Sequence, residues 1–579
     1  MGTKKINKKS IMIQGTGSHV GKSIVTAAIC RILKQDGYRV CPFKSQNMAL
    51  NSYVTASGGE MGRAQVVQAE ACGLEPEVCM NPILIKPTAD TQAQIIFMGK
   101  VVKNMSAAEY NEKKIYFLNK IKEILDDLKK KFDVIVIEGA GSPAEVNLLK
   151  NDIVNMRTAE IAGSPVILVG DIDRGGVFAS FYGTVKLLPR NYRKYIRGLL
   201  VNKFRGDIKL LEPGNDYIAK KLRIPVIGTI PYFRDIYIEE EDSVNLEREK
   251  EKKSTLDFSQ SDKRDNLIRI GVIYLPHISN FTDFNTLELE KNVSLVYIKK
   301  REDLKLLSPH LIIIPGSKST ISDLLYLRRT GMEEEVKRQY KKGAVVMGIC
   351  GGYQILGEKI IDRYKTESAG ANSIDGMGLL GIYTEFLQDK NTCQVNFKFN
   401  PEVLSMWRSL GLICQNDVKD KYVSCYAAED NCNQADMGAS IMKGYEIHMG
   451  ISKIVVGKQG RLLPLFRTVS RGGKPASGDN GDNEGVVCSG KKDDGIVIGT
   501  YIHGIFDNFI FRKILLELIG SKNNIKISGN FGDIKNNSFK KTEVYSYQSF
   551  KEEQYDKLAS IFRENMDMKL LYRILRTGL

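Results

Sequence analysis

A cysteine stands at the end of an apolar run and is followed at once by two glycines. The run 345–349 ("VVMGI") suits a buried strand, and Cys350 precedes Gly351 and Gly352. A strand–Cys–Gly–Gly–helix turn would lift the thiol out of the sheet and aim the Gly351 N–H at a developing oxyanion. The helix start would also favour the thiolate. Cys350 is therefore either a nucleophile or a packed core thiol.

A nucleophilic cysteine requires a second backbone donor and a histidine, and the sequence contains candidates for both. The stretch "PGSKST" (315–320) is another strand-to-turn glycine loop, in which Gly316 or Ser317 would be the second oxyanion donor. His503 follows a strand in "GIVIGTYIHGIFDN", and His448 in "GYEIHMG" competes with it as the base. The order along the chain does not rank the two histidines, because adjacency in space is not visible in a sequence.

The stretch "GTGSHVGKS" (15–23) follows a strand and opens a helix, which is the context of a phosphate-binding P-loop. Backbone N–H groups would hold the phosphates, Lys22 would add positive charge, and the Ser23 hydroxyl would hold Mg²⁺. The spacing departs from the usual loop, because five residues separate Gly15 from Gly21. The expected nucleotide-binding residues are Thr16, Gly17, Gly21, Lys22, Ser23 and Asn202, the last an amide at the end of a later strand.

Carboxylates and amides surround this predicted phosphate site. Glu138 and Asp171 end two further apolar strands, and with Ser23 they are the expected magnesium ligands, although helix capping is an alternative for the aspartate. The segments 43–55 and 62–71 are dense in amides and basic residues, which suits a large substrate bearing carboxylates and amides, or else a solvated surface. The expected substrate-binding residues are Lys44, Gln46, Asn47, Arg63 and Gln65.

The elements that must position these residues read as two α/β domains. Short β-branched runs alternate with helical stretches from residue 11 onward, and again from residue 268. Continuous apolar strands separated by helices indicate a parallel sheet covered on both faces, so two doubly wound domains are expected. The predicted boundaries are a P-loop domain over 1–238, a linker over 239–266, a second domain over 267–520 with polar insertions at about 385–440 and 466–494, and a C-terminal extension over 521–579 ending in a helix.

Composition narrows the class of protein. The 579 residues carry a net charge of +16, which suits a polyanionic small substrate, although a generally lysine-rich composition is the alternative. Basic runs interleaved with aromatics are lacking, so no nucleic-acid partner is expected. The ten cysteines form no C-x-x-C pair, which argues against disulfides and a zinc site. No apolar run reaches bilayer length, so we expect a cytoplasmic protein without a membrane partner.

The motifs of both domains resemble known families. "GICGGYQILG" followed by "GTYIHGIF" is similar to the class I glutamine amidotransferases, and the "G-T-x-x-x-V-G-K" form of the P-loop resembles dethiobiotin synthetase. Over about residues 10–575, the ordered set of motifs resembles the cobyric acid synthase family, a group of glutamine-hydrolysing ATP-dependent amidoligases. The motifs are "KSQNMALNS", "GRAQ", "DIDRGGVFAS", "NKFRGD", "PGSKST", "GICGGYQILG", "GYEIHMG" and "TYIHGIF".

The resemblance implies a reaction and assigns its residues. Cys350 would release ammonia from glutamine with His503 as its base, and ATP with Mg²⁺ would activate carboxylates of a corrinoid. The implied product is adenosylcobyric acid, formed by amidating the b, d, e and g carboxylates of adenosylcobyrinic acid a,c-diamide. One departure matters, because class I enzymes usually carry an acid two residues after the histidine and Ile505 stands there. Glu446 is one candidate for the missing orienting acid.

Two alternative functions share some of these sequence features. The sister enzyme that amidates the a and c carboxylates, cobyrinic acid a,c-diamide synthase, shares both domain types, but "KSQNMALNS" favours the cobyric acid synthases. A P-loop partitioning ATPase is a binding switch that requires no thiol chemistry, and it would leave Cys350 and Gly351 unexplained.

Overall fold

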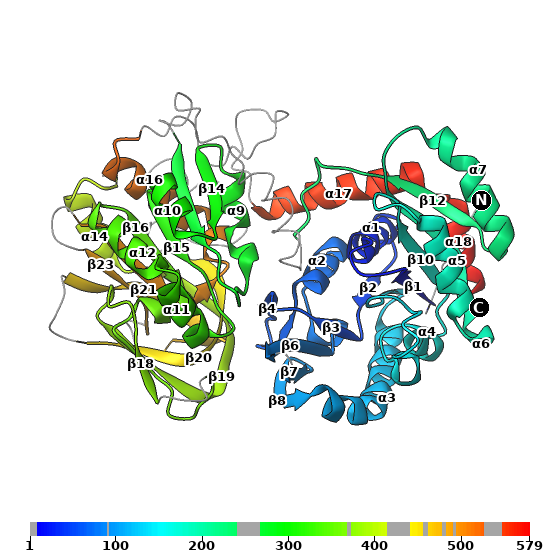
Figure 1. Cartoon of the computed structure of the whole chain (residues 1–579), viewed down its shortest axis with the longest axis horizontal. Coiled ribbons are helices and arrows are strands. Elements are labelled where there is room, and N and C mark those ends of the chain that lie inside the picture. Colours follow the sequence, from blue (N-terminus) through cyan, green and yellow to red (C-terminus); the bar gives the residue numbers. More distant parts are fainter. Residues whose placement is uncertain are drawn as a thin grey trace. The chain divides into compact units, whose positions relative to one another are not determined.

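The computed structural model describes residues 9–89, 92–239, 267–367, 372–413, 441–455, 461–476, 482–489, 494–525 and 547–578. The chain divides into two compact units (Figure 1). Unit 1 consists of Met1–Ala49, Gly59–Glu241 and Gln548–Leu579, and unit 2 of Leu50–Gly58 and Asp242–Tyr547. Most of the expected linker, residues 240–266, lies outside the described residues. Within the described part of the chain, no helix has the length and apolar character needed to cross a membrane.

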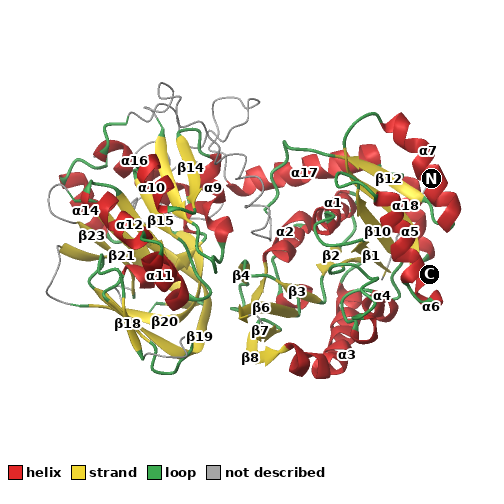
Figure 2. Ribbon diagram, viewed as in Figure 1, coloured by secondary structure: helices red, strands yellow, loops and turns green. Residues whose placement is uncertain are grey.

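Unit 1 is built on a six-stranded sheet in the order β12-β11-β10-β1-β9-β2, and every neighbouring pair is parallel. The central strands are buried along almost their whole length, as expected for a sheet with helices on both faces (Figure 2). The strands are β1 (Lys9–Gly15), β2 (Val40–Phe43), β9 (Val134–Glu138), β10 (Val166–Asp171), β11 (Ile196–Phe204) and β12 (Val226–Pro231). The α/β class predicted from the alternating pattern is confirmed.

The helices of unit 1 follow the strands in the expected alternation. They include α1 (Lys22–Gln35), α2 (Arg63–Cys72), α3 (Ala107–Lys131), α4 (Met156–Ala162), α5 (Val177–Leu187) and α7 (Ile208–Leu222). A smaller four-stranded sheet precedes α3 and consists of β3 (Gln46–Met48), β6 (Ile83–Ala89), β7 (Gln92–Phe97) and β8 (Lys100–Ser106). Its last strand ends in a capping box, because Ser106 and Glu109 exchange side-chain and backbone hydrogen bonds at the start of α3.

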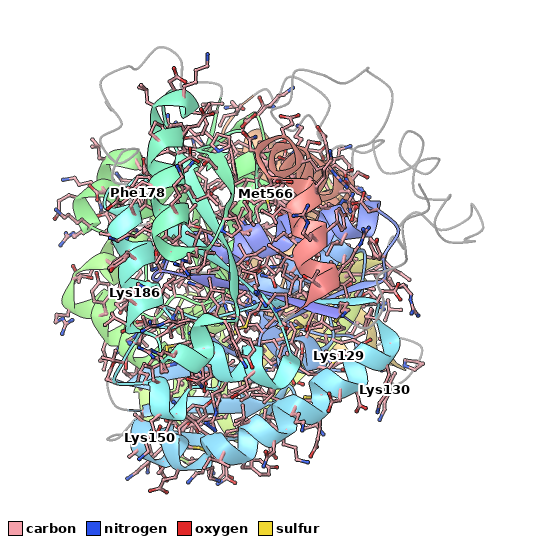
Figure 3. The ribbon with its side chains drawn as sticks, turned by 90° about the vertical axis from the view of Figure 1, so that its right-hand side faces the viewer. Lys129, Lys130, Lys150, Phe178, Lys186 and Met566 are labelled. Carbon is pink, nitrogen blue, oxygen red and sulfur yellow. The ribbon has the colours of Figure 1, made fainter. Side chains whose placement is uncertain are left out.

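The C-terminal helices belong to unit 1, although the sequence placed them in an extension after the second domain. Helices α17 (Tyr547–Asn565) and α18 (Met568–Thr577) bury Leu558, Phe562 and Leu571 in the core formed by β1 and α1. Met566, between the two helices, bridges to Gly228 of β12 (Figure 3). The core around β1 and α1 is therefore completed by residues more than 500 positions away in the sequence.

Unit 2 combines a parallel half and an antiparallel half in one sheet. The parallel half contains β13 (Ile268–Ile273), β14 (Val293–Ile298), β15 (Leu311–Ile314), β16 (Val345–Ile349) and β24 (Ile496–Thr500). The antiparallel half contains β19 (Ile382–Phe399), β20 (Met442–Ile454), β21 (Arg461–Arg471) and β23 (Asn483–Ser489), and the short β25 (Ile502–His503) pairs with β20.

Much of the two predicted polar insertions is core structure. Strand β19 alternates buried and partly exposed residues, which is the pattern of a strand with one face on the core. Helix α14 (Pro401–Ser409) buries Trp407 against Phe399, and Phe466 of β21 packs beside them. Polar residues on the outer faces concealed this alternation in the sequence. Residues 414–440, 477–481 and 490–493, within the same predicted insertions, lie outside the described residues.

We expect the substitution Phe562→Ala to destabilise unit 1 selectively. It removes a fully buried ring from the core, and the cavity should lower the free energy of unfolding by about 3–5 kcal/mol. The single tryptophan, Trp407, lies in unit 2, so its fluorescence reports that unit while far-UV circular dichroism follows both. The dichroism transition of unit 1 should move to lower urea concentration while the fluorescence transition stays in place.

The matched control is Glu564→Ala, an exposed position on the same helix, which should change stability by less than about 0.5 kcal/mol. An equal shift of the Trp407 transition, or a shift no larger than that of the control, would contradict the assignment of α17 to unit 1.

Candidate active site

Cys350 lies on a strained turn between β16 and helix α13 (Gly351–Leu356). Its backbone has φ 53° and ψ −109°, which is uncommon for a residue with a side chain. A Cβ on Gly352 would lie 1.9 Å from the Ile314 carbonyl oxygen, and a Cβ on Gly351 would lie 2.9 Å from the Ser317 backbone nitrogen. Only glycines allow so close an approach of the turn to the 315–320 loop. Steric crowding at this turn therefore explains why glycine occupies positions 351 and 352.

His503 is the histidine that the fold brings to this turn. Its Nδ1 lies 2.7 Å from Oδ2 of Asp283, and the Gly504 N–H donates to Oδ1 of the same carboxylate over 2.9 Å. The side chains of His503 and Asp283 are both almost fully buried. Burial by itself would lower the pKa of His503, but the Asp283 charge and hydrogen bond, together with a hydrogen bond to Cys350, raise that pKa to about 10. The imidazole thus favours its protonated form beside the thiol.

Asp283 takes the place at His503 for which Glu446 was a candidate. Glu446 instead binds Arg471 over 3.0 Å and the competing histidine, His448, over 3.3 Å. Sequence reasoning missed Asp283 because it precedes His503 by 220 positions. The signal that could have found it is an acid within "FTDF", a stretch whose four residues are all buried in the short helix η4 (Phe281–Phe284).

The loop expected to supply the second oxyanion donor lies against both Cys350 and His503. A Cβ on Gly316 would lie 3.1 Å from Cε1 of His503. The Ser317 hydroxyl donates to Asp323 over 2.6 Å, and His277 Nδ1 lies 2.8 Å from the other oxygen of that carboxylate. These contacts hold the loop beside the Cys350 turn, and the oxyanion roles of Gly351, Gly316 and Ser317 stay predictions.

The P-loop of unit 1 is braced from the neighbouring strand. Lys22 donates to the backbone oxygens of Gly17 over 2.8 Å and Gly141 over 3.2 Å. Asn202 donates its amide to the Val20 carbonyl over 2.8 Å, and a Cβ on Gly21 would lie 2.2 Å from the Asn202 nitrogen. Gly21 also has φ 98°, a conformation that favours glycine. Asn202 therefore shapes the loop itself, and Thr16 anchors its start by donating to the Val169 oxygen.

A buried carboxylate beside the P-loop gathers three donors. Glu138 accepts from the Ser23 hydroxyl over 2.8 Å, the Lys44 ammonium over 3.0 Å and the Gln68 amide over 2.5 Å. Burial would raise the pKa of Glu138, but the Lys44 charge and these hydrogen bonds hold it below its usual range. Lys44, expected among the substrate-binding residues, thus lies at the carboxylate next to the P-loop.

The hydroxyl and carboxylate of Ser23 and Glu138 are hard oxygen ligands of the kind that Mg²⁺ takes together with phosphate oxygens. The third expected ligand, Asp171, accepts from Lys203 over 2.9 Å and from the Asp173 N–H over 2.9 Å. Across the described residues, no group of three or more acidic, histidine or cysteine side chains is arranged to hold a metal ion. A magnesium ion here would therefore depend on nucleotide oxygens.

The remaining substrate candidates form buried polar contacts in unit 1. Asn47 donates to Gln65 over 2.9 Å, and the fully buried Gln65 amide nitrogen has no hydrogen-bond partner among the described residues. Arg63 pairs with Glu239 over 2.6 Å, and Gln46 accepts from the Tyr110 hydroxyl over 2.5 Å. An orphaned buried amide is costly, which is consistent with a polar ligand at Gln65.

Comparison with known proteins gives the same two-part division. Residues 11–245 match the CobQ/CobB/MinD/ParA nucleotide binding domain, and residues 269–511 match the CobB/CobQ-like glutamine amidotransferase domain. Cobyric acid synthase from Clostridium botulinum (strain 657 / Type Ba4) is 44% identical over 565 residues, which cover 98% of this chain and 99% of the relative. Cobyric acid synthase from Clostridium tetani (strain Massachusetts / E88) is 44% identical over 565 residues, covering 98% of each chain.

We expect Asp283→Asn to lower the pKa of His503 and the reactivity of Cys350. The raised His503 pKa keeps the imidazolium present up to about pH 10, whereas without the Asp283 charge its proton should leave at lower pH. Alkylation of Cys350 by iodoacetamide at pH 7 should slow by roughly tenfold or more, because about 1.4 kcal/mol corresponds to one pKa unit. Mass spectrometry of the Cys350 peptide over pH 6–11 measures both effects.

The raised pKa of His503 also makes the stability of the fold depend on pH. A histidine pKa raised on folding contributes stability that is complete below about pH 6.5 and is lost as pH rises through about 10, so the wild type's advantage over the variant should disappear there. The control is Asp375→Asn, an exposed carboxylate in the same unit. Unchanged alkylation of Cys350 in the Asp283 variant would disprove the role of this carboxylate.

Proposed function

The chain belongs to the cobyric acid synthase family, and from this premise we propose that it amidates the b, d, e and g carboxylates of adenosylcobyrinic acid a,c-diamide. The product is adenosylcobyric acid, and the nitrogen comes from glutamine at the expense of ATP. The observation that carries the proposal is that one chain holds both halves of amide formation. Cys350, His503 and Asp283 form a thiol site in unit 2, and Lys22, Ser23 and Glu138 form a phosphate site in unit 1.

The glutaminase half uses Cys350, His503 and two backbone N–H groups. The Cys350 thiolate attacks the amide carbon of glutamine, and the Gly351 N–H with a second N–H from the 315–320 loop stabilises the oxyanion. The C–N bond then breaks as the His503 imidazolium gives its proton to the leaving ammonia. Water, deprotonated by His503, cleaves the thioester to give glutamate and restore the thiol. Asp283 holds the imidazole with Nδ1 directed away from the sulfur.

The amidoligase half requires a phosphoryl transfer. A substrate carboxylate attacks the γ-phosphorus of ATP to form an acyl phosphate and ADP, and ammonia then displaces phosphate to form the amide. Magnesium, which Ser23 and Glu138 fit, would neutralise phosphate charge in this step. Lys22 and Lys44 add positive charge beside the same carboxylate. The orphaned amide of Gln65 suits the polar periphery of a corrinoid.

The alternatives account for fewer observations. A partitioning ATPase would leave the buried Asp283–His503 pair beside Cys350 without a purpose. A synthase for the a and c amides would share the chemistry, but the relatives that match 98% of this chain are named for the later product. Mass spectrometry of the product made from adenosylcobyrinic acid a,c-diamide, ATP and glutamine distinguishes the two, because only the proposed enzyme converts four further carboxylates.

Cys350→Ser should abolish glutamine hydrolysis while leaving the ammonia-dependent reaction intact. The serine hydroxyl stays protonated at neutral pH and is a much weaker nucleophile than a thiolate. The rate of glutamine hydrolysis should therefore fall by a factor of about 10³ or more. With ammonium chloride in place of glutamine, the variant should still form the amides at the wild-type rate. Surviving glutaminase would refute the nucleophile assignment, and failure with ammonia would refute the two-site scheme.

Lys22→Ala should give the opposite pattern. Loss of the P-loop ammonium should abolish amidation with either nitrogen source, while glutamine hydrolysis measured without ATP stays close to the wild-type rate. Coupled assays for glutamate and for ADP measure the two halves separately. Amidation that persists in this variant would show that the phosphate site has been placed wrongly.

A further inference from the structure

A short segment of the chain leaves unit 1 and belongs to unit 2. Residues 50–58 are part of unit 2, whereas residues 49 and 59 on either side belong to unit 1. Asn51, Ser52 and Val54 are completely buried, which is unusual for a nine-residue connection. The segment is therefore built into the amidotransferase fold, although it lies in the sequence between α1 and α2 of the P-loop domain.

Asn280 holds the backbone of this segment. Its side-chain oxygen accepts from the Ser52 N–H over 3.4 Å, and its amide nitrogen donates to the Ser52 carbonyl over 3.2 Å. One amide thereby pairs both polar groups of Ser52, much as a neighbouring strand would. Asn280 has φ 52° and caps η4, the short helix that carries Asp283, and the Asp283 N–H donates to the Asn280 carbonyl over 3.0 Å. A single residue, Asn280, thus connects the segment to Asp283, the acid that orients His503.

Tyr445 makes a second connection to the catalytic histidine. Its ring stacks on His503 with centroids 5.5 Å apart, and its hydroxyl donates to the Ser52 carbonyl over 3.3 Å. Tyr53 of the segment packs edge-on against the Tyr445 ring, with the two ring centroids 5.2 Å apart. At the far end, Thr392 of β19 donates to the Gly58 carbonyl over 2.8 Å. The segment therefore contacts Asn280, which precedes Asp283 in η4, and Tyr445, which stacks on His503.

The two ends of the segment lead to the same carboxylate in unit 1. Lys44, six residues before Leu50, and Gln68, ten residues after Gly58, both hydrogen-bond to Glu138. Binding of a magnesium nucleotide at Ser23 and Glu138 would replace these donors, because the carboxylate has few free lone pairs. The residues that flank the segment would then have to change partners.

We propose that residues 50–58 are a positioning element that couples the glutaminase to the nucleotide site. Through Asn280 and Tyr445 the segment sets the orientation of Asp283 and His503, and through Lys44 and Gln68 it responds to the occupancy of Glu138. The inference rests on the proposed function. Coupling of this kind typically changes an affinity or rate by about 5–150-fold, so ATP with Mg²⁺ and corrinoid should raise glutaminase kcat/KM by a factor in that range.

The test compares Asn280→Gly with Asn400→Gly. Glycine tolerates the positive φ of Asn280 and removes the side chain that holds Ser52 and donates to the Tyr445 hydroxyl over 3.3 Å. Asn400 is a matched control, because it is similarly buried and lies in the same unit. Its side chain accepts from the Glu402 N–H and donates to the Pro464 carbonyl, and neither partner belongs to the segment. Stimulation of glutaminase by ATP, Mg²⁺ and corrinoid should fall to less than twofold in Asn280→Gly and persist in Asn400→Gly. Both variants should amidate normally with ammonia.

The outcomes separate this inference from the proposed function. If the wild type neither hydrolyses glutamine nor amidates, the proposed function fails. If the wild type is active and Asn280→Gly is stimulated as strongly as the wild type, only the coupling inference fails. Loss of stimulation in both asparagine variants would also overturn it, because a general loss of stability would then explain the effect.

Hydrogen exchange on the wild type gives a readout that does not depend on a variant folding. Addition of ATP and Mg²⁺ with corrinoid should alter amide exchange by at least twofold in peptides covering 50–58 and 280–284. Exchange in α14, residues 401–409, should stay the same. No change in the first two peptides would overturn the proposal.

Discussion

The thiol chemistry proposed for unit 2 depends on one buried charge pair, that of Asp283 and His503. Both side chains are almost wholly removed from water, so neither charge is tolerable without the other. Removing one partner of such a pair typically costs about 3–5 kcal/mol, so the pair also stabilises the fold. The same carboxylate also accepts from the Gly504 N–H and so holds the backbone that carries the histidine. A single acid therefore sets the orientation, charge and backbone position of the base.

The topology of the sheet explains why these groups meet. The parallel strands β15 and β16 end at one edge, so the loop at 315–320 and the turn at Cys350 lie side by side there. Strand β24 pairs with β16 and leads into His503, while the Cys350 N–H donates to Thr500 at the end of β24. The strained backbone of Cys350 is tolerated because the surrounding strands determine it. The predicted nucleophile, base and oxyanion donors therefore come from the ends of three strands, β15, β16 and β24.

Sequence reasoning succeeded where the signal was local and failed where it was not. The Cys-Gly-Gly turn and the P-loop were visible because steric and phosphate-binding requirements act on neighbouring residues. Asp283 was hidden because its partner is 220 residues away, and an isolated acid between phenylalanines has no distinctive spacing. The amphipathic pattern of the C-terminal helices predicts that they pack against a core but does not identify that core, so the sequence alone places them in an extension. The strands β19 and β21 were concealed by polar residues on their outer faces.

Glu138 in unit 1 is a second buried carboxylate, but its partners differ from those of Asp283. Both acids are buried, and in both cases a cation compensates the charge. Asp283 faces a histidine, whereas Glu138 faces Lys44 and Ser23, whose partners would change if a magnesium nucleotide bound there. A buried carboxylate cannot lose its compensating cation without gaining another, so nucleotide binding at Glu138 requires an exchange of partners. Under the coupling proposal, the residues that such an exchange would release, Lys44 and Gln68, lie on either side of residues 50–58, the segment that Asn280 holds next to Asp283.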